Sequence, residues 1–393
     1  MEGKRFLHSI KLTNLLSYGS EGVFLELEPL NVLIGPNASG KSNLIEAIGL
    51  LAASPRDLTE PFRDGGTIKD WLWKGVAQAP AAEIEVVLSY ESAPLRYHLA
   101  FGELNARLSI RLESLEDLRE PNRIYFRHDS QGLRLGEYPV VTNSPTGDSA
   151  LRSRVRQQSL FSQVKDPLSH PQLTFVGERF GDIRLFRNWQ IGRDNPVRRP
   201  QDVNLPNDFL LESANNFGLV LSNLMNRVET KRLLIEKLKL VYEKVVDVRP
   251  EVQGGTILVF FHEERLSDPV PAARLADGIL HYLGLLMILL HPDPPPLVCI
   301  EEPEIGLHPD ILPKVADMLV DAAQRTQLIV TTHSDVLVSR LSEVPESVVV
   351  CEREPLDRGT SLRRLNPEQL EPWLEKYRLG ELWAMGEIGG NRW

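Results

Sequence analysis

The sequence contains only two cysteines, which excludes a fold held by disulfide bonds or a cysteine-rich zinc site. Both of them, Cys299 and Cys351, lie in apolar, strand-like runs, so we expect buried thiols in a reducing compartment. No apolar signal segment follows residues 1–5, and the longest apolar run, residues 283–290, is too short to cross a bilayer. These absences predict a cytoplasmic protein that makes no membrane contact.

Internal repeats and low-complexity tracts are also absent. Hydrophobic residues make up 42% of the chain and charged residues 25%, a balance that is typical of globular domains and excludes a disordered chain. With 393 residues, the chain is long enough to form two or three lobes around a sizeable core.

The chain has fewer basic than acidic residues, 44 Lys/Arg against 54 Asp/Glu, so its formal net charge is −10. This negative balance argues against general affinity for nucleic acid. The charge is unevenly distributed, however. Residues 151–200 hold ten Lys/Arg and only four Asp/Glu, so this segment carries +6 and the remainder −16. Such a segment suits a nucleic-acid backbone, and it equally suits a solvated face that pairs with acidic neighbours. The sequence leaves both interpretations open.

The most informative feature that is present is a glycine-rich stretch between an apolar, β-branched run (residues 30–34) and a run with helical spacing (residues 43–48). Strand, glycine-rich loop and helix in this order predict a P-loop, whose backbone amides wrap β- and γ-phosphates at a helix N-terminus. We expect the chain to bind a nucleoside triphosphate, with Lys41 bridging its phosphates and the Ser42 hydroxyl ligating Mg²⁺. The candidate nucleotide-binding residues are Gly35, Pro36, Asn37, Ala38, Ser39, Gly40, Lys41, Ser42 and Asn43.

Two later apolar runs end in residues suited to phosphate chemistry. Residues 296–300 lead into adjacent carboxylates, Glu301 and Glu302, and the carboxyl ends of strands are where α/β proteins place their sites. Glu301 would hold hydrated Mg²⁺, and Glu302 could polarise the attacking water. The second run, residues 328–332, ends at His333, which could contact the γ-phosphate.

A fourth element opens the strongly apolar helix expected over residues 280–290. Its residues 274–279 include Asp277 and Gly278, and a helix N-terminus with a glycine suits an approaching phosphate. An ordinary helix cap at Asp277 is the alternative.

These four elements, in this order, resemble the ABC-type ATPases of the RecF/SMC/OLD group. Residues 35–42 are similar to their Walker A motif, residues 275–278 to their signature, Glu301-Glu302-Pro303 to Walker B, residues 306–309 to the D-loop, and His333 to the switch histidine. Residues 10–18 are similar to the opening of the group, and residues 379–383 resemble bacterial ATPases of the RecF-like, AAA_21 type.

The resemblance implies a role for each motif residue. Glu302 would act as the base, Lys41 and His333 would stabilise charge on the γ-phosphate, and Ser42 with Glu301 would position Mg²⁺. It further implies a homodimer in which Ala276, Asp277 and Gly278 of one subunit cap the ATP of the other. The chain departs from the group where Ala276 replaces the usual signature serine and where Glu301 replaces the commoner Asp. Four glutamines are candidates for the Q-loop, namely Gln157, Gln158, Gln163 and Gln190.

The architecture we expect is α/β, a P-loop NTPase fold with an ABC-type ATPase head, an antiparallel β lobe and a short helical insertion. The predicted divisions are residues 1–135 (Walker A and antiparallel strands, with a meander over 83–135), 136–270 (insertion) and 271–393 (signature to switch histidine). Within the insertion we expect a long loop over 136–172 and one helix of about 25 residues within 209–246, ended by Pro250 and too short for an SMC arm. Residues 348–353 look like a last ATPase strand that lacks the further acids of a TOPRIM domain, so the resemblance implies a stand-alone ATPase module.

The function that follows is MgATP binding and hydrolysis in DNA maintenance or phage defence, with a separate nuclease or other effector as partner. DNA contact would use the basic segment 151–200. The alternative is an ATP-dependent switch that regulates a toxin or signalling protein without touching nucleic acid.

Overall fold

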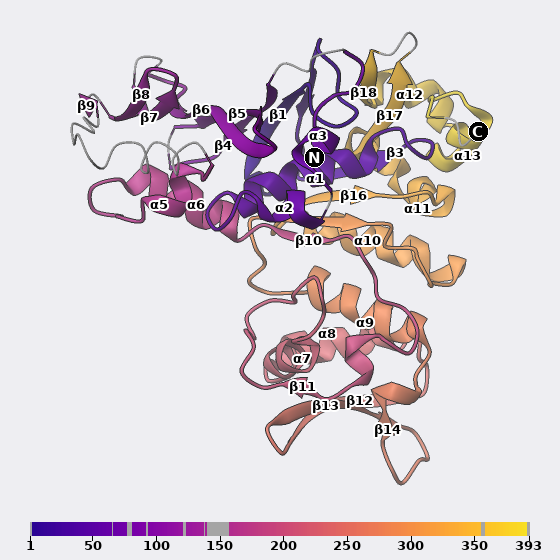
Figure 1. Cartoon of the computed structure of the whole chain (residues 1–393). Helices are drawn as coiled ribbons and strands as arrows, with labels where there is room; N and C mark the ends of the chain where they lie inside the picture. The colour runs from indigo at the N-terminus through magenta and orange to yellow at the C-terminus, as the bar shows by residue number, and fades with distance from the viewer. Residues whose placement is uncertain are drawn as a thin grey trace.

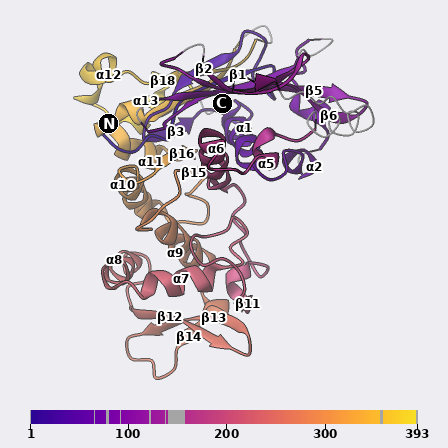
Figure 2. The same cartoon turned by 90° about the vertical axis from the view of Figure 1, so that its left-hand side faces the viewer.

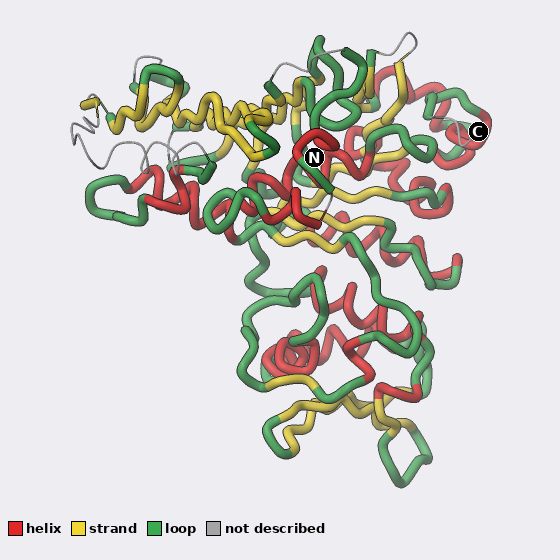
Figure 3. The backbone as a smooth tube through the Cα atoms, in the orientation of Figure 1, coloured by secondary structure: helices red, strands yellow, loops and turns green. Residues whose placement is uncertain are grey.

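The computed structural model describes residues 2–64, 66–76, 81–91, 93–120, 123–136, 138–139, 157–354 and 358–390. Two large sheets occupy the upper part of the molecule, and a lower lobe carries a smaller sheet (Figure 1). Figure 3 shows helices between the upper strands and the strands at the lower end. Among the described residues, no helix combines the length and the apolar character needed to cross a membrane.

A six-stranded, mainly parallel sheet contains the strands that lead to the glycine-rich loop, to Glu301 and to His333. Its order is β10 (Arg184–Phe186), β15 (Leu297–Glu301), β16 (Gln327–Thr331), β3 (Leu30–Ile34), β17 (Val348–Glu354) and β18 (Gly359–Arg364), with β18 antiparallel at the edge. Every residue of β3 and β16 is buried, because a parallel sheet covered on both faces needs apolar side chains on both. The predicted α/β class and the strand before the glycine-rich loop are confirmed.

An eight-stranded antiparallel sheet lies against one side of this core. Its order is β2 (Val23–Glu26), β1 (Leu7–Thr13), β4 (Ala82–Leu88), β5 (Leu95–Leu104), β6 (Arg107–Asp117), β7 (Ile124–Asp129), β8 (Gly132–Leu135) and β9 (Tyr138–Pro139). Buried and half-buried residues alternate along β4, as expected for a sheet with one covered face. The meander predicted over residues 83–135 is confirmed.

Helices fill the space around the two sheets. One core combines the antiparallel sheet, α1 and one face of the parallel sheet, and a second core lies on the opposite face of the parallel sheet. The helices are α1 (Lys41–Ala53), α2 (Glu60–Asp64), α3 (Ile68–Trp71), α5 (Leu160–Gln163), α6 (Pro171–Gly181), α10 (Leu312–Ala322), α11 (Asp335–Arg340), α12 (Pro367–Leu374) and α13 (Leu379–Met385). Of the loop predicted over 136–172, residues 137 and 140–156 lie outside the described residues. The remainder is not all loop, because β9, α5 and the start of α6 occupy part of it.

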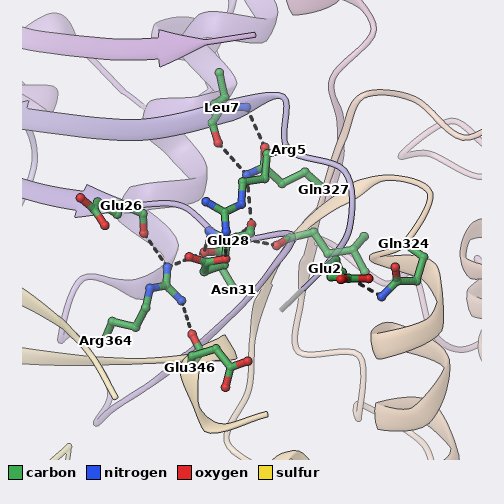
Figure 4. A network of polar contacts seen from close by, with 11 residues as sticks. Glu2, Arg5, Leu7, Glu26, Glu28, Asn31, Gln324, Gln327, Glu346 and Arg364 are labelled. Atoms are coloured by element: carbon green, nitrogen blue, oxygen red, sulfur yellow. Dashed lines mark hydrogen bonds and ion pairs between the residues drawn. The ribbon is translucent and has the colours of Figure 1, made fainter. Parts of the chain in front are cut away.

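Buried polar side chains join the two large sheets (Figure 4). The Gln327 amide accepts a hydrogen bond from the Leu7 amide (2.8 Å) and donates to the Leu7 and Glu28 carbonyls (2.7 and 3.0 Å). Arg364 donates to Asn31 Oδ1 at 2.6 Å, and burial lowers the pKa of its guanidinium to about 10. The Gln327 bonds fix β1 against the parallel sheet, whereas the Arg364 bond joins β18 to β3 within that sheet. Such pairing is needed because buried polar groups are costly unless they are paired.

The lower lobe is built from α7 (Phe217–Met225), α8 (Val228–Leu238), α9 (Asp277–Leu289) and strands β11 (Gln201–Asp202), β12 (Val245–Gln253), β13 (Thr256–Glu263) and β14 (Val270–Pro271) (Figure 2). The single long helix predicted here is wrong. The chain leaves the helical conformation at Arg227, which is extended (φ −97°, ψ 110°), and begins a second helix at Val228. Pro250 ends no helix; it lies inside β12, an edge strand that tolerates a missing N–H.

Candidate nucleotide-binding site

The glycine-rich loop connects β3 to α1, as the motif predicts. Gly35 and Gly40 have positive φ angles of 148° and 106°. A Cβ atom on Gly35 would lie 2.2 Å from the Cys351 carbonyl oxygen, and one on Gly40 would lie 2.4 Å from Thr360 Oγ1. Only glycine fits at these two positions, so the loop's shape is set by close contact with β17 and β18 as well as by the motif.

Side chains from distant segments hold the outer side of this loop. The Tyr18 hydroxyl donates to the Gly40 carbonyl at 3.0 Å, and Thr360 Oγ1 donates to the Ser39 carbonyl at 2.8 Å. Asn43 donates to Ser17 Oγ at 2.7 Å. No sequence pattern points to Thr360, because it lies more than 300 residues after the loop that it supports.

Lys41 is buried, with 6% of its surface exposed, and its ammonium donates to the Gly35 and Pro36 carbonyls, both at 2.9 Å. Burial lowers the pKa of Lys41, and the nearby Cys351, Glu302 and Glu301 groups oppose this shift. The positive charge is therefore held inside the curve of the loop, where phosphates would approach the loop amides and the α1 N-terminus.

Ser42 and Glu301, the residues expected to hold Mg²⁺, lie together. Ser42 Oγ donates to Glu301 Oε2 at 3.2 Å, and burial raises the pKa of the Glu301 carboxyl to about 7. The described residues contain no cluster of three or more His, Cys, Asp or Glu that could enclose an ion. Two oxygen ligands beside a phosphate loop nevertheless fit Mg²⁺, which takes few protein ligands and completes its shell with phosphates and water.

Glu302 and His333 lie at the ends of the adjacent strands β15 and β16. Glu302 Oε1 is 3.7 Å from His333 Nε2, and the Glu302 amide donates to the Thr331 carbonyl at 3.0 Å. Glu302 has a left-handed backbone (φ 47°), so the chain turns between the two carboxylates. This turn is what allows adjacent residues to serve one site, since side chains alternate along a regular strand.

Sequence reasoning missed Glu304. Its Oε1 accepts hydrogen bonds from Thr332 Oγ1 (2.8 Å) and from the His333 amide (2.7 Å), and burial raises the pKa of its carboxyl. Glu304 therefore ties the segment after Glu302 to the loop that carries His333. A glutamate three residues beyond a strand end carries no pattern that would have revealed this role.

The candidate signature residues lie in the lower lobe, apart from the glycine-rich loop of the same chain (Figure 1). Ala276 occupies the N-cap position of α9, and its methyl side chain forms no capping hydrogen bond. Asp277 Oδ1 accepts a hydrogen bond from Arg198 Nη2 at 2.6 Å, which lowers the pKa of Asp277. A Cβ atom on Gly278 would lie 2.6 Å from the Gly306 carbonyl oxygen, so this glycine allows the helix to touch the segment after Glu302.

Among the four glutamines considered for the Q-loop, Gln190 lies nearest the site. It follows β10, which pairs with β15, and its neighbour Trp189 donates from Nε1 to the Glu301 carbonyl at 2.7 Å. The other three glutamines lie just before or within α5, which packs with the antiparallel sheet.

The basic segment 151–200 is only partly described: Arg152, Arg154 and Arg156 lie outside the described residues. Arg187 pairs with Glu212 (2.9 Å) and Glu46 (3.4 Å), and Arg198 pairs with Asp277. These two arginines thus serve internal contacts and are not part of an open basic surface.

The fold and these motifs define a class: the chain is a P-loop ATPase of the ABC type, related to RecF and to SMC heads. The model of the AAA_21 family, described as "AAA domain, putative AbiEii toxin, Type IV TA system", matches residues 30–339. The chain belongs to this family.

Two solved structures share the fold, and one curated protein is similar to part of the chain. An Smc head bound to the C-winged helix domain of ScpA has 13% sequence identity and a TM-score of 0.55, over 93% of this chain and 99% of that one. A second Smc head, derived from Pyrococcus furiosus, has 12% identity and a TM-score of 0.53, over 94% and 99%. The DNA replication and repair protein RecF of Moorella thermoacetica is 33% identical over 93 residues. That match spans 22% of this chain and 23% of RecF.

Proposed function

We propose that this chain binds MgATP and hydrolyses it slowly, with two subunits arranged head to tail around two ATP molecules. The observation that carries the proposal is the convergence of Lys41, Ser42 and Glu301 at the glycine-rich loop, with Glu302 and His333 at the ends of neighbouring strands.

Each residue has a role in this proposal. The loop amides and Lys41 bind the β- and γ-phosphates, and Ser42 with Glu301 holds Mg²⁺, which supplies charge neutralisation when bound. Glu302 accepts a proton from the attacking water, and His333, 3.7 Å from Glu302, lies where it orients that carboxylate and contacts the γ-phosphate.

The dimer explains why the signature residues lie in the lower lobe. Within one chain, Ala276, Asp277 and Gly278 are on α9 while the P-loop is on α1, so they can serve ATP bound by a second subunit. The α9 N-terminus would present its amides and its positive dipole end to the partner's γ-phosphate.

Lys41→Ala tests the nucleotide site, because it removes the ammonium held inside the loop. We expect loss of measurable ATP binding by calorimetry, while the fold, followed by circular dichroism, remains. Lys314→Ala, on the surface of α10, is the control and should bind ATP like the wild type. Unchanged affinity in Lys41→Ala would refute the proposal.

For the biological role, we propose action in DNA maintenance or phage defence together with a separate effector. A regulator of a toxin or signalling protein is the second candidate, favoured by the family's description and by the internal pairing of Arg187 and Arg198. A mobility-shift assay with DNA, with and without ATP, separates the two. Neutralising Arg152, Arg154 and Arg156 together should weaken DNA binding and flatten its salt dependence. No binding at low salt would favour the regulator.

A further inference from the structure

A buried histidine joins α9, the helix that begins at the signature, to the segment after Glu302. His281 is only 7% exposed, and its Nδ1 lies 2.5 Å from the Ile305 carbonyl oxygen. A carbonyl can only accept a hydrogen bond, so Nδ1 carries the proton. Burial lowers the pKa of His281 to about 4, so the ring is neutral at physiological pH.

A second contact lies one turn earlier on the same face of α9. Gly278 abuts the Gly306 carbonyl so closely that a Cβ atom would lie 2.6 Å from it. Positions 278 and 281 are three apart on a helix and therefore face the same side. The signature end of α9 thus rests on residues 305–306 at two points.

The same histidine is connected to the hydrolytic side of the site. Its ring lies against the Trp189 ring, with 4.1 Å between the centroids, and Trp189 Nε1 donates to the Glu301 carbonyl. On the other side, Glu304 binds the loop of His333. The segment 302–306 is therefore fixed both to the catalytic strand ends and, through His281, to the signature helix.

We propose that His281 is a positioning residue: it fixes the signature relative to the hydrolytic residues of its own subunit, so that the signature reaches the partner's ATP in register. This inference rests on the proposed function, because the signature acts only in a dimer. Loss of the His281 hydrogen bond should therefore weaken capping of the partner's ATP and leave ATP binding by the subunit itself unchanged.

The competing explanation is that His281 is simply a core histidine. The chain offers a matched control in His291, which lies just beyond the other end of α9. It is 3% exposed, packs edge-on against Phe209 with centroids 5.0 Å apart, and also has a pKa lowered by burial. His291 makes no contact with the segment 302–306 among the interactions of the described residues.

The first experiment compares His281→Phe, His281→Asn and His291→Phe. His281 and Trp189 both line a cavity of about 40 Å³. In His281→Asn, the amide nitrogen can take the place of Nδ1 as a donor. With a non-hydrolysable ATP analogue, light scattering should show a dimer dissociation constant raised about three- to tenfold in His281→Phe, the scale of one lost hydrogen bond. His281→Asn should recover most of this loss, and His291→Phe should match the wild type, with ATP affinity at low protein concentration unchanged in all three.

The second experiment places the variant in trans. Lys41→Ala subunits cannot bind ATP but can cap the ATP of a wild-type partner. Adding His281→Phe to the Lys41→Ala subunit should weaken capture of wild-type subunits, whereas adding His291→Phe should not. If His281→Phe fails to fold, His281→Leu, which has a smaller side chain and likewise lacks the donor to the Ile305 carbonyl, should give the same pattern.

The two levels of failure differ. A wild-type protein that neither hydrolyses ATP nor dimerises with it overturns the proposed function, and the inference with it. A wild type that does both, with His281→Phe indistinguishable from His291→Phe in the two experiments, overturns only the inference.

Discussion

Gly278 and Gly284 lie on the same helix, and the structure predicts opposite effects when each becomes alanine. At Gly284 the added Cβ would meet only Phe217 Cε2 at 3.8 Å, an ordinary contact. Gly284→Ala should therefore stabilise the protein by about 0.5–1 kcal/mol, the gain in helix propensity. At Gly278 the Cβ would lie 2.6 Å from the Gly306 carbonyl oxygen and would have to move about 0.8 Å to reach ordinary contact.

Overpacking of this kind costs about 1–3 kcal/mol, and backbone on both sides limits relaxation. We therefore expect Gly278→Ala to lower stability by about 1–2 kcal/mol once the gain in helix propensity is included. Urea unfolding followed by tryptophan fluorescence tests this, through the midpoints of variants that share one m-value. Equal or increased stability of Gly278→Ala relative to Gly284→Ala would refute the packing argument.

The result also bears on a test of the proposed dimer, Gly278→Asp, which should block ATP-dependent dimerisation in light scattering if the signature caps the partner's ATP. In the proposed dimer this variant would place a carboxylate near the partner's γ-phosphate, but it also inserts a Cβ against Gly306. Charge repulsion can be separated from misplacement of the segment 305–306 only if the alanine variant is measured beside it.

Three further predictions concern the site. Glu302→Gln should still bind ATP in calorimetry, while phosphate release falls about 10²-fold or more. If Glu301→Gln, and not Glu302→Gln, retains ATP without hydrolysing it, the roles of base and Mg²⁺ ligand assigned to the two glutamates are reversed. The raised pKa of Glu301, about 7 against 4.5, means that the folded protein holds this proton more tightly than the unfolded chain, so ATP-free stability should fall as pH rises from about 4.5 through 7. Glu301→Gln should therefore stabilise the protein more at pH 8 than at pH 5. If the substitution shifts the unfolding midpoint equally at both pH values, this prediction is contradicted. Ala276→Ser should cap α9, add about 1 kcal/mol in thermal unfolding, and tighten ATP-dependent dimerisation; a serine variant that melts and dimerises like the wild type would count against it.

The sequence alone predicts an element correctly where its local residue pattern is compatible with only one structure. The apolar run before Gly35 and the helical spacing after Ser42 predicted β3, the loop and α1, because burial on both faces of a parallel sheet leaves few alternatives. The alternation over residues 83–135 likewise predicted the antiparallel strands.

Tertiary packing decided what local pattern could not. The break at Arg227 contains neither proline nor glycine, so periodicity alone continued the helix through it. Pro250 was interpreted as a helix terminator because an edge strand could not be recognised before its partner β13 was known. Glu304, Trp189 and His281 act through contacts between segments far apart in sequence, and no spacing signals such contacts. The divisions at residues 135 and 270 stay predictions.

The place of β3 in its sheet has a consequence for biosynthesis. Both strands that pair with it, β16 and β17, come from the last third of the chain, almost 300 residues later. At about 5–20 residues per second, the ribosome needs roughly 15–60 s to supply them. Until then the glycine-rich loop also lacks the Cys351 carbonyl of β17, which lies against Gly35, and the Thr360 side chain of β18, which lies against Gly40. We expect the nascent protein to acquire its nucleotide site only near the end of translation, and chains truncated before residue 348 should fail to retain an ATP analogue.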